Sequence, residues 1–142
     1  MPANIQTAVL GASGYAGMEL ARLLARHPRM GDPLLLRREK EGGSETAAVP
    51  VNGHSLPLKR FSWDTLALSK TEVLFLATPH EVSRVLAPEA VERGLRVIDL
   101  SGAWRLKREE HRAVYGFSDP DPHKAAVYTD SAVYGLPELN RE

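Results

Sequence analysis

The sequence contains no cysteine, and this absence excludes disulfide bonds, thiolate metal ligands and cysteine nucleophiles within the 142 residues. An excess of either charge is missing as well, because 18 Lys and Arg residues balance 18 Asp and Glu residues. A neutral chain has no overall field that would attract nucleic acid or an anionic membrane surface. Long apolar runs are absent, and residues 1–4 show no signal-peptide pattern. These absences predict a cytoplasmic soluble domain with neither nucleic acid nor a membrane as its partner.

The composition that is present is that of an ordinary globular domain. Hydrophobic residues make up 43% of the chain and charged residues 25%. A chain of 142 residues is long enough to bury one hydrophobic core, so a single domain is expected.

The most informative stretch is a glycine turn that follows the first apolar run, residues 5–10. Gly11, Gly14 and Gly17 follow at three-residue intervals, and an amphipathic pattern begins at Met18. A strand, a tight glycine turn and a helix together present free backbone N–H groups and the positive end of the helix dipole to a phosphate. The spacing differs from the common Gly-x-Gly-x-x-Gly fingerprint, so its context must support the interpretation.

Short apolar runs predict four strands, at residues 5–10, 34–36, 73–77 and 97–100. Helical patterns and short loops separate them. The alternation predicts an α/β fold with a doubly wound, mostly parallel, Rossmann-like sheet.

Helices are expected at residues 18–27 and 82–93, from the spacing of their apolar residues. Pro88 is expected to kink or restart the second helix, and Thr78 or Ser83 is available to cap its start.

The middle of the chain is less regular. Residues 49–51 and 56–58 flank the turn dipeptide Asn52-Gly53, and their prolines limit them to edge strands or extended loop. Residues 63–68 predict one or two helical turns.

In a doubly wound sheet, ligands bind beyond the carboxyl ends of the strands, so Gly11, Arg37, Thr78 and Ser101 should converge on one crevice. Arg37 stands about 20 positions after Gly17, where NAD-binding folds carry a carboxylate for the ribose hydroxyl. A guanidinium binds a 2′-phosphate instead, so Arg37 and Arg38 predict NADP as the cofactor. The alternative is a solvated charge run.

Other polar residues near the strand ends have two possible roles each. Ser13 either donates to a phosphate oxygen or is a simple turn residue. His80 either contacts the nicotinamide half of the cofactor or is a polar residue near a helix start. Trp104 is expected to pack in the core.

Five segments resemble N-acetyl-γ-glutamyl-phosphate reductases, in the order of that family: residues 11–17, 75–83, 97–106, 115–117 and 133–141. The glycine turn alone is shared with aspartate-semialdehyde dehydrogenases. The segments after Asp99 and before Asn140 separate the two families.

The resemblance implies an enzyme of arginine biosynthesis that reduces a small-molecule acyl phosphate with NADPH to a semialdehyde and releases phosphate. In the family a cysteine thiolate attacks the acyl phosphate, and a histidine assists. Residues 1–142 contain no cysteine, so they are expected to be the NADP-binding domain, cut before the catalytic domain and without a catalytic residue. The full-length protein is expected to be a homo-oligomer.

The resemblance also implies particular contacts. Arg105 is placed near the substrate, where it would bind a carboxylate or phosphate, and the alternative is a structural ion pair. The cofactor contacts that are implied come from Gly11, Ser13, Gly14, Tyr15, Ala16, Arg37, Arg38, Pro79, His80 and Ser101.

Two other functions stay open, a related acyl-phosphate reductase (aspartate-semialdehyde dehydrogenase or a lysine-pathway homologue) and a non-catalytic nucleotide-binding module. Residues 119–123 with His111 offer possible metal ligands, but the prolines favour an extended loop with solvated carboxylates, and no metal is expected. Glu109 and Glu110 predict an exposed helix surface.

Overall fold

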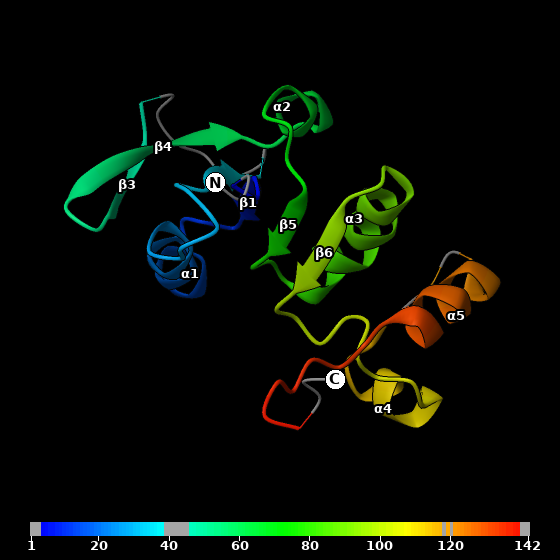
Figure 1. Ribbon diagram of the computed structural model, residues 1–142. Coiled ribbons are helices and arrows are strands. Elements are labelled where there is room, and N and C mark those ends of the chain that lie inside the picture. The colour runs from blue at the N-terminus through cyan, green and yellow to red at the C-terminus, as the bar shows by residue number, and fades with distance from the viewer. Residues whose placement is uncertain (1–3, 39–45, 118, 120, 140–142) are drawn as a thin grey trace.

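The computed structural model describes residues 4–38, 46–117, 119 and 121–139. Six strands form one sheet in the order β3-β4-β2-β1-β5-β6, in which only the β3–β4 pair is antiparallel (Figure 1). The elements in chain order are β1 (Thr7–Leu10), α1 (Tyr15–Ala25), β2 (Leu34–Arg37), β3 (Ala48–Val51), β4 (His54–Arg60), α2 (Trp63–Leu68), β5 (Val73–Leu76), α3 (His80–Glu92), β6 (Arg96–Asp99), α4 (Glu109–Val114) and α5 (Pro122–Ser131). The predicted mostly parallel, Rossmann-like sheet is confirmed.

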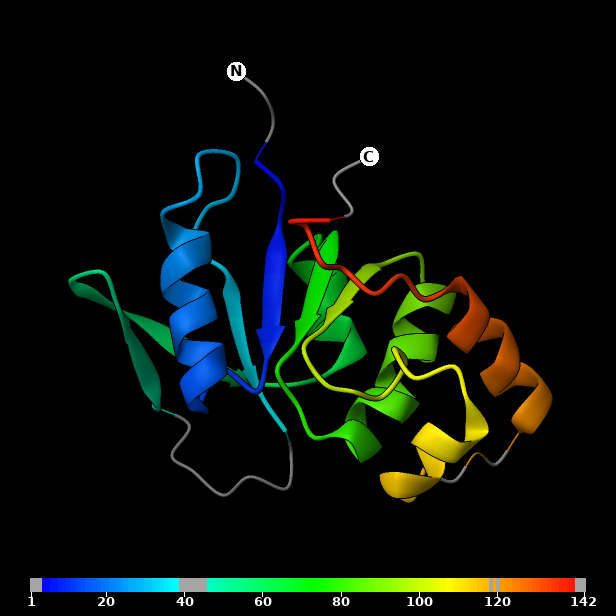
Figure 2. The same ribbon diagram turned by 90° about the horizontal axis from the view of Figure 1, so that it is seen from below.

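Side chains from both faces of the sheet are buried, because helices cover both faces. Figure 2 shows α1 on one side of the strands and α3 with α5 on the other. Successive strand residues point to opposite faces. The α1-side core therefore receives Val9, Leu35 and Phe75, together with Ala21 and Leu24 of α1. The α3-side core receives Leu10, Leu36, Leu74 and Leu76, together with Ala87 and Ala90 of α3.

The four predicted strands and both predicted helices are present, with shifted ends. The first strand begins at Thr7, and Ile5 forms only an isolated bridge with Met30. The first helix begins at Tyr15, three residues before its apolar pattern starts, because the glycine turn leads directly into helical geometry.

The predicted restart at Pro88 is wrong, because α3 is one helix with Pro88 inside it. The expected cap is also wrong. Pro79 occupies the N-cap position without a side-chain hydrogen bond, and the hydroxyls of Thr78 and Ser83 pair with each other at 2.8 Å in the interior.

The prediction that prolines restrict both middle segments to edge strands or loop is right for β3 and wrong for β4. β4 lies between β3 and β2, but its two pairings use different residues. His54 to Pro57 pair with β3, and Leu58 to Arg60 pair with β2. Pro57 therefore has a neighbour on one side only, which satisfies the restriction on proline inside a sheet.

Among the described residues after β6, the structure has two helices, α4 and α5. The expected extended loop at residues 119–123 is wrong at its end, because α5 begins at Pro122. Asp121 caps it by accepting a hydrogen bond from the backbone N–H of Lys124 at 3.0 Å. Glu109 and Glu110 lie exposed in α4, as predicted. Within the described residues, no helix is long and apolar enough to cross a membrane.

Candidate nucleotide-binding site

The carboxyl ends of the four predicted strands meet at one edge of the sheet, as expected. Backbone hydrogen bonds join the residues that follow each strand to the neighbouring strand end: Gly11 N to Leu36 O (3.0 Å), Ala77 N to Leu10 O (2.9 Å) and Leu100 N to Leu76 O (2.9 Å). The strand order changes direction between β1 and β5, since β2 lies on one side of β1 and β5 on the other. A ligand crevice is expected at such a switch point.

The glycine turn fits this switch point because two of its residues have no room for a side chain. Gly11 has φ +87°, and a Cβ at this position would overlap the carbonyl oxygen of Ala77. A Cβ on Gly17 would overlap the carbonyl oxygen of Gly11 and crowd Ala12. The turn is therefore packed directly against the chain that leaves β5.

The N-terminus of α1 opens from this turn. Gly14 is its N-cap and offers no side-chain acceptor, and the first turn contains no acidic residue. Tyr15 is 92% exposed, and Ser13, Gly14 and Ala16 are exposed as well. An α-helix leaves its first N–H groups unpaired within the helix, so this end is suited to an anion.

Three arginines lie at the carboxyl ends of β2 and β4. Arg37 is only 4% exposed, so the alternative of a solvated charge run is wrong for this residue. Arg38 follows it and is half-buried. Arg60, exposed at the end of β4, pairs in register with Arg37. No pattern in the sequence indicated Arg60 as a site residue, because β4 was not expected beside β2.

A second helix N-terminus lies next to the glycine turn. Pro79 is exposed, and His80 is the first residue of α3. The His80 ring packs edge to face against Tyr115, at 5.4 Å between centroids, and against Phe117, at 5.5 Å. His80 is thus held by the segment that follows α4.

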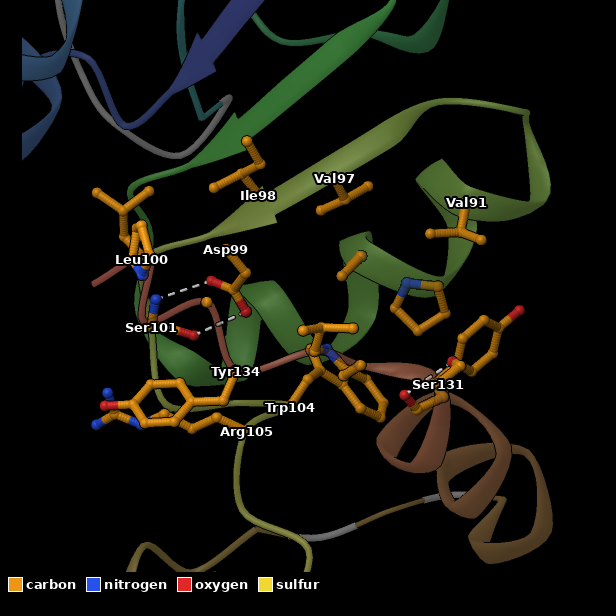
Figure 3. A pocket seen from close by; sticks show the side chains of 17 residues that line it. Val91, Val97, Ile98, Asp99, Leu100, Ser101, Trp104, Arg105, Ser131 and Tyr134 are labelled. Atoms are coloured by element: carbon orange, nitrogen blue, oxygen red, sulfur yellow. Dashed lines mark hydrogen bonds between the residues drawn. The ribbon is translucent and has the colours of Figure 1, made fainter. Parts of the chain in front are cut away.

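A tight polar turn follows β6 and involves Asp99, which the sequence did not single out. The Asp99 carboxylate accepts hydrogen bonds from Ser101 N at 2.9 Å and from Ser101 Oγ at 3.0 Å (Figure 3). Ser101 Oγ accepts a further hydrogen bond from Ala103 N at 3.1 Å. These three bonds fix the position of the Ser101 hydroxyl.

Arg105 lies at the polar end of a hollow of about 850 Å³ beside β6 (Figure 3). Its guanidinium is 5.7 Å from the ring centroid of Tyr134. Among the residues that the structure describes, Arg105 forms no ion pair, so the structural ion-pair alternative gains no support. The hollow is mostly apolar, with Asp99, Ser101 and Arg105 as its polar residues near the strand end. Its size suits a small molecule.

Arg84 and Asp119 form a buried ion pair that the sequence did not predict. Arg84 donates to Asp119 and, at 2.7 Å, to the carbonyl of Ala103, while Arg112 binds the other carboxylate oxygen of Asp119. The side chains of Arg84 and Asp119 are 8% and 12% exposed, so the expectation of solvated carboxylates is wrong for Asp119. Burial, and then the charge of Arg112, lowers the pKa of Arg84.

Trp104 packs in the core, as predicted. Its ring lies against the Arg84 guanidinium at 4.6 Å, and its Nε1 donates to the carbonyl of Ser83 at 3.2 Å. Trp104 therefore anchors the turn after β6 in the α3-side core.

The fold, the switch point and the open helix end define a nucleotide-binding domain of the Rossmann type. The chain belongs to the family described as "Semialdehyde dehydrogenase, NAD binding domain", whose model matches residues 6–142.

Curated relatives confirm the resemblance found in the sequence motifs. The chain is 41% identical over 140 residues to N-acetyl-gamma-glutamyl-phosphate reductase of Pseudomonas aeruginosa, covering 97% of this chain and 40% of the relative. It is 43% identical over 134 residues to the enzyme of that name from Thermus thermophilus, covering 94% of this chain and 37% of the relative. The chain thus spans about 40% of the length of such relatives.

Solved structures of aspartate-semialdehyde dehydrogenases share the fold. A probable enzyme of this kind from Pseudomonas aeruginosa is 28% identical with a TM-score of 0.58, covering 78% of this chain and 34% of its own. Aspartate semialdehyde dehydrogenase II of Vibrio cholerae, in complex with ASA, is 25% identical with a TM-score of 0.57, covering 72% and 32%.

Proposed function

We propose that this chain supplies the NADP-binding part of an N-acetyl-γ-glutamyl-phosphate reductase. The proposed reaction reduces an acyl phosphate to a semialdehyde and releases phosphate, as a step of arginine biosynthesis. The observation that carries the proposal is the uncapped N-terminus of α1, opened by a turn whose Gly11 packs against Ala77 at the sheet's switch point. The identity of about 41% to reductases of that name supports the substrate class.

The cofactor's phosphates would bind at the start of α1, at Gly11, Ser13, Gly14, Tyr15 and Ala16. Membership in a family of NAD-binding domains indicates a nicotinamide dinucleotide, and we assign NADP. Arg37 and Arg38 would pair with the 2′-phosphate, with Arg60 beside them as a third cation.

The nicotinamide half would lie toward Pro79, His80 and Ser101, on the far side of the glycine turn from the arginines. NADPH bound there supplies a hydride. Arg105, beside the hollow along β6, would bind the carboxylate or phosphate of the acyl phosphate substrate.

The proposed reaction needs a nucleophile that these residues do not contain. The chain has no cysteine, so it cannot form the thioester on which a thiolate mechanism depends. We therefore expect the 142-residue chain to bind NADPH without turning over acyl phosphate. We further expect the complete enzyme to be a cytoplasmic homo-oligomer.

Calorimetric titration with NADPH and NADH tests the cofactor assignment. The expected result is tighter binding of NADPH, a preference that falls at least tenfold in the double variant Arg37→Met/Arg38→Ser. Arg26→Ala, an exposed change at the opposite end of α1, is the matched control and should keep the preference. Equal affinities for the two cofactors in the unaltered chain would contradict the assignment.

A second candidate, aspartate-semialdehyde dehydrogenase, is favoured by the solved structures that share this fold. Both reactions reduce an acyl phosphate with the same cofactor, so nucleotide binding does not separate them. Assays of the full-length enzyme with N-acetyl-γ-glutamyl phosphate and with aspartyl phosphate would separate the two candidates.

A further inference from the structure

The turn after β6 has a buried side and an open side. Ala103 and Trp104 are buried, whereas Arg105, the next residue, is exposed. The side chains of Trp104 and Arg105 leave the turn in opposite directions (Figure 3). The groups that hold Ala103 and Trp104 therefore determine the position of the backbone from which Arg105 projects.

Arg84 of α3 holds both buried residues of this turn. Its Nη1 donates to the carbonyl oxygen of Ala103 at 2.7 Å, and its guanidinium carbon lies 4.6 Å from the centroid of the Trp104 ring. Its Nη2 donates to the Asp119 carboxylate instead. Because the guanidinium is planar and rigid, the bond to Asp119 also fixes the direction of the bond to Ala103.

On the open side, the Arg105 guanidinium rests on the turn itself. A Cβ on Gly102 would be 3.5 Å from Nε and from Nη2 of Arg105, and the centroid of the Tyr134 ring is 5.7 Å from the guanidinium carbon. Among the described residues, no carboxylate pairs with Arg105, so its N–H groups are available to an anion. A displacement of the turn would displace these N–H groups with it.

The position of a guanidinium matters for anion binding. It binds a carboxylate or a phosphate through two parallel N–H···O bonds, which require a defined orientation. A guanidinium that is already held in place also loses less conformational entropy when the anion binds.

We propose that Arg84 is a positioning residue that acts through Arg105. By holding the Ala103 carbonyl and the Trp104 ring, it fixes the turn so that Arg105 meets the anionic group of the acyl phosphate substrate. This inference rests on the proposed function and adds to it a residue that does not touch the substrate.

The reverse reaction of the full-length enzyme identifies the anion that Arg105 binds. In that direction the semialdehyde, inorganic phosphate and NADP⁺ give the acyl phosphate, NADPH and a proton. Arg105→Met is expected to raise one KM by about ten- to hundredfold, the range of a hydrogen bond to a charged group. A raised KM for the semialdehyde indicates its carboxylate, and a raised KM for inorganic phosphate indicates the phosphate.

A double-mutant cycle tests whether Arg84 acts through Arg105. Arg84→Met is expected to raise the same KM about three- to tenfold, the range of one neutral hydrogen bond, and to leave the KM for NADP⁺ within about twofold. The variant Arg84→Met/Arg105→Met should have the KM of Arg105→Met alone, because Arg84 has no effect once Arg105 is absent. Arg93→Met is the matched control and should change neither KM, since its guanidinium pairs with Glu89 and packs on Trp63.

Calorimetric titration of the 142-residue chain with NADPH checks the fold of each variant. Arg84→Met is expected to bind NADPH as the unaltered chain does. If this variant does not fold, Arg84→Lys replaces it with the same expectations. The lysine keeps a cation beside Asp119 but has no second nitrogen for the Ala103 carbonyl.

The possible failures are distinguishable. If the unaltered enzyme is active and the Arg84 variant leaves the KM for both semialdehyde and phosphate unchanged, the inference is wrong and the proposed function stands. Additive effects of the Arg84 and Arg105 variants would also overturn the inference, because Arg84 would then act independently of Arg105. If the unaltered enzyme does not oxidise the semialdehyde, the proposed function is wrong and the inference fails with it.

Discussion

At the scale of single residues, alanine substitutions at three glycines distinguish the energetic cost of steric overlap from that of backbone strain. Gly94 has φ +83° and open space around it, Gly17 is helical with no room for a Cβ, and Gly11 combines a positive φ with overlap. The expected losses in the free energy of unfolding are about 1–2 kcal/mol for Gly94→Ala from the left-handed backbone. They are about 1–3 kcal/mol for Gly17→Ala from overpacking, and about 2–5 kcal/mol for Gly11→Ala from both effects together.

Urea unfolding of the three variants measures these losses. A Gly11→Ala variant as stable as Gly94→Ala would show that the Gly11–Ala77 contact relaxes freely. The close packing of the turn described above would then be wrong.

The Arg84–Asp119–Arg112 cluster supports a second prediction at this scale. Two guanidiniums share one carboxylate, so Asp119→Asn leaves two cations, the buried Arg84 and the half-buried Arg112, facing each other. The expected loss is about 3–5 kcal/mol. Arg84→Met removes the bonds to Asp119 and to the carbonyl of Ala103, but it leaves Asp119 paired with Arg112, so no buried charge is left unpaired and a smaller loss of about 1–2 kcal/mol is expected.

The double variant Arg84→Met/Asp119→Asn is expected to lose less than the sum of the two single losses, because one of the opposed cations is gone. A double-mutant cycle in urea measures this coupling. Glu19→Gln, in an exposed pair with Arg22, is the surface control, with an expected effect below about 1 kcal/mol. Additive effects of Arg84→Met and Asp119→Asn would contradict the shared-carboxylate description.

The candidate site shows which residues a sequence can reveal. Gly11 and Ser101 follow apolar runs directly, so parallel-sheet geometry alone brings them to one edge. Asp99 acts through a local turn, because both of its hydrogen bonds come from Ser101 two residues along the chain, so the Asp-x-Ser spacing could have indicated it. Arg84 and Asp119 act through a contact that tertiary packing creates, and no spacing in the chain encodes it. Arg60 was missed for a related reason, since its position depends on how β4 pairs.

At the scale of elements, a surface cluster of Glu92, Lys124 and Tyr128 joins α3 to α5. It predicts that the stability of the fold depends on pH. The Glu92 carboxylate accepts a hydrogen bond from Tyr128 Oη at 2.8 Å and binds Lys124. The bond from Lys124, and then that from Tyr128, lowers the pKa of Glu92, and Glu92 in turn raises the pKa values of Lys124 and Tyr128.

A shifted pKa makes the free energy of unfolding depend on pH. The stability that Glu92 contributes is present above the ordinary carboxyl pKa and is lost as the pH falls through the lowered value. The contributions of Lys124 and Tyr128 are present at neutral pH and are lost as the pH rises through their raised values. NMR titration of the Glu92 carboxyl is expected to show the lowered pKa. Lys124→Met should bring it back toward the ordinary value, whereas Lys70→Met, which is exposed elsewhere, should not.

The elements that the sequence predicted are those whose neighbours are close in the chain or whose pattern is strong. The β1–α1–β2 unit has a continuous apolar run on each side of an amphipathic helix. The interior place of β4 depends on pairing half its length with β3 and half with β2, which proline content alone does not show. α5 was missed because only Ala125 and Thr129 are buried, too few positions for a clear periodic signal.

At the scale of the whole molecule, the order of the strands determines when each core can form. β1 lies in the middle of the sheet, with Ala8 opposite Leu34 on one side and opposite Leu74 on the other. One neighbour of the central strand therefore comes from the early part of the chain and the other from its second half.

This central position has a consequence for synthesis on the ribosome. Until β5 has left the exit tunnel, β1 has one open edge, and its α3-facing side chains have no helix to cover them. Nascent chains that expose residues up to α2 are therefore expected to stay sensitive to protease, and resistance should appear only once α3 and β6 have emerged. Pulse proteolysis of stalled chains of increasing length measures this, and early resistance would show that β1–α1–β2 folds alone. Between the emergence of β1 and that of β5, the unpaired edge of β1 must be kept from pairing with other chains, and this depends on factors outside the chain.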